Sequence, residues 1–81
     1  MDNRTLAQRL RRHARELEAE GGNLYRVRAY RHAADFIEEE DPPVALLLER
    51  GGRKALATLP GIGSHIALTI ENLLHVGAPA A

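Results

Sequence analysis

The sequence predicts an all-α fold, a compact domain of four to five helices joined by short turns. Apolar residues recur in steps of three and four along separate segments, which is the spacing of one buried helical stripe. Glycine and proline pairs divide the chain between these segments. No segment alternates apolar and polar residues in the β-branched pattern of a strand, so a sheet is not expected.

The first helix is predicted over residues 2–20. Asp2 or Asn3 can cap its start, because a short polar side chain accepts hydrogen bonds from the free amides of the first turn. The Gly21-Gly22 pair supplies the left-handed backbone that ends a helix. The buried stripe of this helix consists of Leu6, Leu10, Ala14 and Leu17.

The second helix is predicted to follow an extended lead-in at residues 23–26. It ends at Asp41-Pro42-Pro43, because the residue before a proline is pushed out of the helical region. Its buried stripe consists of Val27, Tyr30, Ala34 and Ile37, and its outward face carries Arg28, Arg31, His32 and Asp35.

Two short helical segments, residues 43–49 and 53–58, are predicted on either side of Gly51-Gly52. A tight hairpin at residues 59–63 leads to a last helix over residues 64–75. The buried face of that helix carries Ile66, Ile70, Leu73 and Leu74. Gly77 is expected to end it, so residues 1–77 are predicted to form a single domain and residues 78–81 a frayed tail.

The chain has 81 residues and a mass of 8.9 kDa, which suffices for one small core but not for a polymerase, ligase or nuclease catalytic domain. It contains no cysteine, which excludes disulfides and thiolate metal sites. No apolar run approaches the roughly 20 residues of a membrane span, and the N-terminus lacks the apolar core of a signal peptide. We therefore expect a cytoplasmic protein without a membrane partner.

Charge is unevenly distributed although the net charge is zero. Residues 4–31 carry eight arginines against three glutamates, whereas residues 35–49 carry acids and no base. Such a basic block favours a polyanionic partner even where the total charge does not. Ten of the eleven basic residues are arginine, a choice that suits phosphate recognition and that a GC-rich genome would favour equally.

The segment Leu59-Pro60-Gly61-Ile62-Gly63 joins two predicted helices and is typical of a helix-hairpin-helix motif. Its glycines allow close approach to a nucleic-acid strand, and the amides at the start of the following helix form an anion site suited to a DNA phosphate. Contacts of this kind are independent of base sequence and sensitive to salt. The alternative is a plain helix-helix turn with glycine at the cap.

A second motif precedes the hairpin: from residue 22 the sequence reads GNLYRVRAYRHAA, and LPGIGSHIA follows from residue 59. Together the two resemble the N-terminal helix-hairpin-helix domain of family X DNA polymerases, the DNA polymerase beta-like domain that bacterial members share, over nearly the whole chain. This resemblance implies a four-helix domain that binds gapped or nicked DNA near a 5′-phosphate, in DNA repair or replication. It also implies K⁺ or Na⁺ on the backbone carbonyls of Ala57, Leu59 and Ile62.

The chain departs from that family at the residues that carry its lyase chemistry. Thr69 stands where the family has the lysine that forms a Schiff base, and His65 and Arg26 replace two further lysines. Neither threonine nor arginine offers an amine nucleophile near neutral pH. The only lysine, Lys54, lies before the hairpin. We therefore expect neither lyase nor polymerase activity.

Several polar side chains admit two interpretations. His65 is either a phosphate donor or an exposed histidine without a role, and Tyr30 is either a core residue or a neighbour of the DNA 5′ end. His13 is expected in the core, while His32, His75 and Leu68 are expected at the surface. The residues expected at the DNA are Gly61, Ile62, Gly63, Ser64 and His65 of the hairpin region, with Arg26, Tyr30 and Arg31 of the second helix.

The sequence thus favours a non-enzymatic, sequence-independent DNA-binding module. A single hairpin makes few phosphate contacts, so a homodimer or a catalytic repair or replication partner is expected beside it. The alternative is a protein-interaction domain that uses the acidic end of the second helix or Leu68. A lyase that uses Lys54 or the N-terminal amine is the least favoured hypothesis.

Overall fold

The computed structural model describes residues 1–76, and within this range the chain is entirely helical apart from its turns. The helices are α1 (Asn3–Ala19), α2 (Leu24–Glu38), α3 (Val44–Ala57) and α4 (Ser64–Val76). The all-α prediction is confirmed. The predicted helix end at Gly77 and the predicted tail at residues 78–81 lie outside the described residues.

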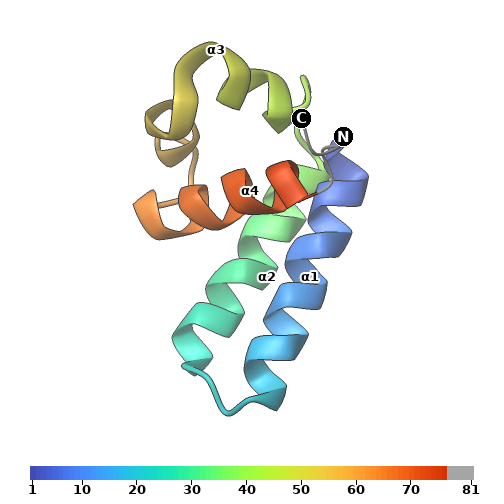
Figure 1. The fold of residues 1–81 in the computed structure, drawn as a ribbon, viewed down its shortest axis with the longest axis vertical. Helices are drawn as coiled ribbons and strands as arrows, with labels where there is room; N and C mark the ends of the chain where they lie inside the picture. The colour runs from blue at the N-terminus through green and yellow to red at the C-terminus, as the bar shows by residue number, and fades with distance from the viewer. Residues whose placement is uncertain (77–81) are drawn as a thin grey trace.

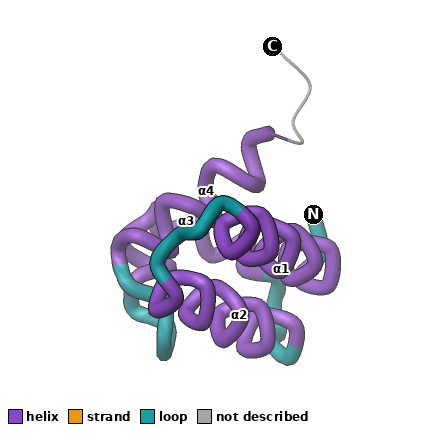
Figure 2. Tube along the Cα trace, turned by 90° about the horizontal axis from the view of Figure 1, so that it is seen from below, coloured by secondary structure: helices purple, strands orange, loops and turns teal. Residues whose placement is uncertain are grey.

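Helices α1 and α2 form an antiparallel pair, and α4 crosses this pair while α3 folds back over α4 (Figure 1). The view from below shows α1 and α2 side by side (Figure 2). The closest packing joins α1 to α2 and α3 to α4. The turn between α3 and α4 joins the two helices of the second pair at one end (Figure 1).

Both helices of the first pair begin at a polar cap. The side-chain oxygen of Asp2 accepts the amide of Thr5 at 2.8 Å, and that of Asn23 accepts the amide of Tyr25 at 2.8 Å. Because Asn23 is a cap, α2 starts at Leu24, and the predicted extended lead-in at residues 23–26 is wrong.

Helix α3 contains the break predicted at its glycine pair. Gly52 has φ 68° and ψ −168°, a conformation that glycine adopts without steric cost and that separates two helical pieces. The second piece therefore points in a new direction, and its end leads directly into the turn before α4.

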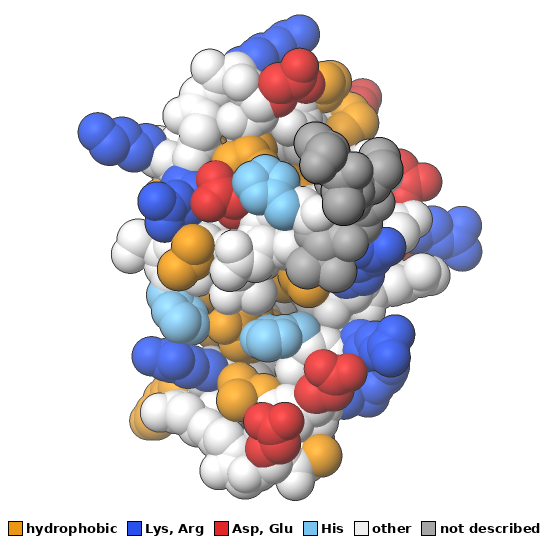
Figure 3. Space-filling view, viewed as in Figure 1, with side chains coloured by type: hydrophobic (Ala, Val, Ile, Leu, Met, Phe, Trp, Pro, Cys, Tyr) orange, Lys and Arg blue, Asp and Glu red, His pale blue; other side chains and the backbone are white. Residues whose placement is uncertain are grey.

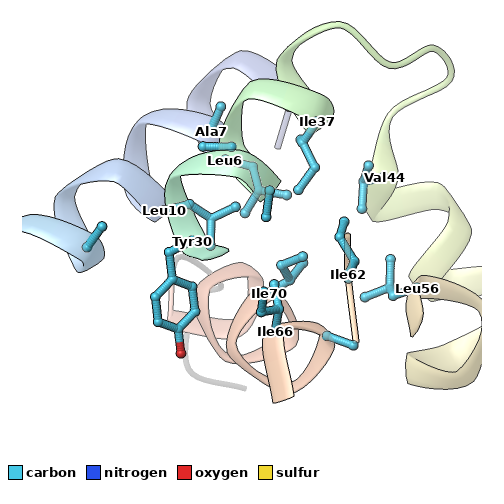
Figure 4. Close-up of a cluster of buried hydrophobic side chains, with 14 of the residues drawn as sticks. Leu6, Ala7, Leu10, Tyr30, Ile37, Val44, Leu56, Ile62, Ile66 and Ile70 are labelled. Carbon is cyan, nitrogen blue, oxygen red and sulfur yellow. The ribbon is translucent and has the colours of Figure 1, made fainter. Parts of the chain in front are cut away.

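The core is aliphatic and includes one residue of the turn itself. Ile62 is only 2% exposed and lies near Leu56 and Val44, facing Ile70 of α4 (Figure 4). One polar side chain joins the core, because Asn3 accepts the amide of Val44 at 2.7 Å and donates to the carbonyl of Glu40 at 3.0 Å. This asparagine ties the start of α1 to the segment between α2 and α3.

None of the helices formed by residues 1–76 combines the length and the apolarity that a membrane span requires. His32, His75 and Leu68 are exposed, as predicted.

Candidate nucleic-acid interface

The turn between α3 and α4 is a tight hairpin held by its own backbone. The amide of Ile62 donates to the carbonyl of Leu59 at 3.0 Å, and Gly61 has φ 75°, a left-handed conformation in which other residues are strained. The buried side chain of Ile62 anchors the turn to the core. The hairpin is therefore a rigid corner whose glycines face outward.

The amides that follow this corner are available to a ligand. The carbonyl of Gly63 accepts the amide of Ala67 at 2.9 Å, and this is the first backbone hydrogen bond of the α4 helix. Among residues 1–76, the amides of Gly61, Gly63, Ser64 and His65 have no acceptor within the protein. A Cβ atom at Gly61 or Gly63 would meet nothing within 4 Å. Unpaired donors at the positive end of a helix, with open space before them, form a site for an anion.

A groove runs from this corner to the start of α2. It has a volume of about 310 Å³ and is lined mainly by apolar surface, with Arg26 and His65 at its polar positions. The structure thus brings Arg26, predicted from the sequence, to the hairpin. Its lining, among the residues that the structure describes, includes no Asp or Glu and consists of Tyr25, Arg26, Ala29, Tyr30, Gly63, His65 and Ile66.

Tyr30 lies beneath the groove and is 2% exposed. Its hydroxyl lies 3.0 Å from Nε2 of His65 and 3.0 Å from Oγ1 of Thr69. The half-buried ring of His13 packs edge-on against Tyr30, with the ring centres 4.8 Å apart. Of the two interpretations of Tyr30, the structure therefore favours the core residue, one that supports the exposed His65 from below.

Arg31 does not reach the hairpin groove. It pairs with Glu18 at 3.1 Å and lines a separate hollow together with Arg11 and Arg15. Arg11 in turn pairs with Asp35 at 2.8 Å and with Glu38, and these carboxylates raise the pKa of Arg11. Asp35 and Glu38 of α2 are thus engaged with α1, and neither of them lines the hairpin groove.

The structure adds two basic residues to the site. Arg53 and Lys54 line a hollow of about 220 Å³ on the α3 side of the hairpin, with Ala57 and Ser64. The signal available in the sequence was their position, one to two helical turns before the hairpin. On the face seen in Figure 3, Lys and Arg side chains project from both flanks, with acids dispersed between them.

Backbone carbonyls of the hairpin are the candidate cation ligands. The carbonyl of Leu59 already accepts one amide, whereas those of Ala57 and Ile62 accept no backbone amide from residues 1–76. Carbonyl oxygens are ligands suited to a hard cation such as K⁺ or Na⁺. No group of three His, Asp or Glu side chains that could hold a metal occurs in the described part of the chain.

No curated protein and no solved structure matches the sequence. Residues 1–79 match the family described as "Helix-hairpin-helix domain". Domains of this family commonly bind DNA without sequence preference, which agrees with a glycine corner that offers backbone amides rather than base-reading side chains. Because the match covers nearly the whole chain, the protein belongs to the helix-hairpin-helix domain family.

Proposed function

We propose that this domain is a non-enzymatic module that binds the DNA backbone without sequence preference through its hairpin. The unpaired amides of Gly61, Gly63, Ser64 and His65, in front of open space, are the observation that carries this proposal. They suit phosphate oxygens, and contacts to phosphates carry no information on base sequence.

Basic residues on both sides of the hairpin support a strand that crosses it. Arg26 lies on the α2 side, and Arg53 and Lys54 lie on the α3 side. Gapped, nicked or single-strand-containing DNA is the proposed preferred form, because an interrupted backbone bends more easily than an intact duplex and follows a convex corner at lower cost. Such DNA arises in repair and replication, which are the proposed setting.

Chemistry at the DNA is not part of the proposed role. The Thr69 hydroxyl bonds Tyr30 and has no amine with which to form an imine. A K⁺ or Na⁺ ion on the carbonyls of Ala57, Leu59 and Ile62 is proposed to stiffen the corner. A single hairpin offers few phosphate contacts, so a second copy of the chain or a catalytic repair or replication protein is proposed to share the DNA.

Binding to nicked, gapped and intact duplexes of one sequence tests the proposal, by fluorescence anisotropy between about 50 and 200 mM salt. Gly61→Ala is compared with Gly21→Ala as its matched control. Both glycines have a left-handed backbone, φ 75° and 77°, and both have open space, so the two variants carry the same strain. Only Gly61 lies at the hairpin.

We expect steeply salt-dependent binding that weakens at least about fivefold in Gly61→Ala and is unchanged in Gly21→Ala. Equal binding by both variants would remove the hairpin from the interface. The absence of any salt-dependent DNA binding would favour the protein-interaction module instead.

A further inference from the structure

A closed set of hydrogen bonds lies under the hairpin. The Thr69 hydroxyl is 3.3 Å from the carbonyl of His65, one helical turn earlier in α4. The same hydroxyl is 3.0 Å from the hydroxyl of Tyr30, which is 3.0 Å from Nε2 of His65. The set therefore begins and ends on His65 and passes through a buried tyrosine of α2.

The number of protons available in this set determines which group donates and which accepts in each hydrogen bond. A carbonyl only accepts, so the Thr69 hydroxyl donates its one proton to His65, the usual bond of a helical threonine to the preceding turn. Thr69 must then accept the proton of Tyr30. Because the Tyr30 hydroxyl donates its one proton to Thr69, it can only accept from His65. Nε2 of His65 therefore carries a hydrogen.

The other ring nitrogen of His65 is left free. Nδ1 has no partner among residues 1–76, and His65 is exposed at the groove beside Gly63. Nδ1 is also the ring nitrogen nearer the main chain. In a neutral imidazole with hydrogen on Nε2, Nδ1 is an acceptor and repels a phosphate oxygen.

We propose that Tyr30 is a positioning residue that holds neutral His65 in the Nε2–H tautomer, so that His65 donates to a DNA phosphate only after the ring gains a second proton. This inference rests on the proposed function and adds to it that a second proton on the His65 ring strengthens backbone binding by this domain. Histidine is the side chain whose charge ordinarily changes between about pH 5 and pH 8.

The surroundings of His65 leave the phosphate as the partner for the charged ring. From α2, Tyr25 and Arg26 line the same groove, and from α1 His13 faces Tyr30. From α3, Arg53 and Lys54 lie beside the neighbouring Ser64. No Asp or Glu of the described residues lines either hollow, so a carboxylate does not satisfy the imidazolium before DNA arrives.

The first measurement is DNA affinity between about pH 8 and pH 5 at fixed salt. We expect binding to tighten by about tenfold as the pH falls, the effect of one charge-assisted hydrogen bond. His65→Gln should lose this change. His32→Gln, which removes an exposed histidine of α2, is the matched control and should keep it. A pH dependence that survives in His65→Gln would overturn the proposal.

The second measurement is the tautomer of His65 in the DNA-free protein, read from ¹⁵N NMR shifts near pH 8. The native protein should show hydrogen on Nε2. Thr69→Val keeps the side-chain shape but releases the Tyr30 proton for Nε2, so His65 should change to the Nδ1–H tautomer and bind DNA with little pH dependence.

Hydrogen on Nδ1 in the native protein, or the same tautomer in both proteins, would overturn the proposal. Because this measurement needs no DNA, it separates the two hypotheses. The expected tautomers with no DNA binding at any pH would contradict the proposed function while leaving the role of Tyr30 intact.

Discussion

The guanidinium of Arg53 pairs with the carboxylate of Glu71 at 3.3 Å, across the two helices that flank the hairpin. Arg53 belongs to the second piece of α3 and lines the hollow next to Ser64, while Glu71 lies in α4. The side chain of Glu71 is 26% exposed and that of Arg53 is 55% exposed. A basic residue that is well placed for a phosphate is therefore partly neutralised in the free protein.

Glu71→Gln is expected to tighten DNA binding about threefold, because Arg53 is released and a negative charge beside the interface is removed. Folding stability should change by less than about 1 kcal/mol, since ion pairs in contact with solvent contribute little. Glu16→Gln, which breaks the 3.3 Å pair with Arg12 within α1, is the control for the change in net charge. Equal effects of both substitutions on affinity would indicate a long-range field rather than a local contact.

Arg26 and Arg31 provide a test of where the strand runs. Arg26 lines the groove beside the hairpin, whereas Arg31 is paired with Glu18 outside it. Arg26→Gln should weaken DNA binding by about threefold to tenfold and lower the slope of log affinity against log salt by about one. Arg31→Gln should have a much smaller effect in the same titration. The reverse order would place the DNA over the α1–α2 face.

Local signals account for most of what the sequence predicted correctly. Apolar spacing, polar caps and the Pro-Gly-Ile-Gly corner act over a few residues, and they located the helices, the break at Gly52 and the hairpin. The predicted extended lead-in at residues 23–26 is wrong, because the side chain of Asn23 accepts the amide of Tyr25 and α2 starts at Leu24.

Contacts between distant segments decide what residue spacing does not predict. Arg31, a predicted DNA contact, pairs with Glu18 of α1 and lies outside the hairpin groove. The same limit applies to Arg53, whose direction depends on the break before it, and to Asn3, whose partners are about 40 residues away. The spacing of residue types along the sequence predicts none of these three contacts.

The cap of α1 predicts an acid-sensitive contribution to stability. Hydrogen bonds from the side chain and backbone of Thr5 hold the pKa of Asp2 below its ordinary value in the folded protein. A group whose pKa is lowered by folding stabilises the fold above its unfolded pKa, and the stabilisation is lost as the pH falls through the folded value. This contribution should therefore be constant near neutral pH and be lost progressively as the pH falls below about 4.

Thermal melts of the native protein and of Asp2→Asn between about pH 7 and pH 3 measure this contribution. Asparagine also caps a helix but does not titrate, so the native protein should lose stability relative to Asp2→Asn in the acid range. A constant difference between the two proteins across the whole range would show that the Asp2 carboxylate makes no such bond.

A substitution at Gly63 is expected to raise the stability of the fold and at the same time to weaken DNA binding. Gly63 precedes the first residue of α4 and its carbonyl opens the helical ladder, so it occupies the cap position. In Gly63→Ser, the hydroxyl oxygen should accept an amide of the first turn, from His65 or Ile66, and raise the stability of the fold by a few tenths of a kcal/mol. Space is available, because a Cβ there meets nothing within 4 Å.

The same hydrogen bond should weaken DNA binding by about tenfold, because it occupies a donor that the phosphate needs and adds atoms on the open side of the corner. Gly63→Ala separates the effect of the hydrogen bond from the effect of added atoms, since its methyl group adds bulk without an acceptor. It should weaken DNA binding less than Gly63→Ser does and should slightly lower the stability of the fold. Melting curves and anisotropy titrations on the three proteins decide the matter. If Gly63→Ser is stabilised and still binds DNA like the native protein, the amides at the start of α4 do not hold the phosphate.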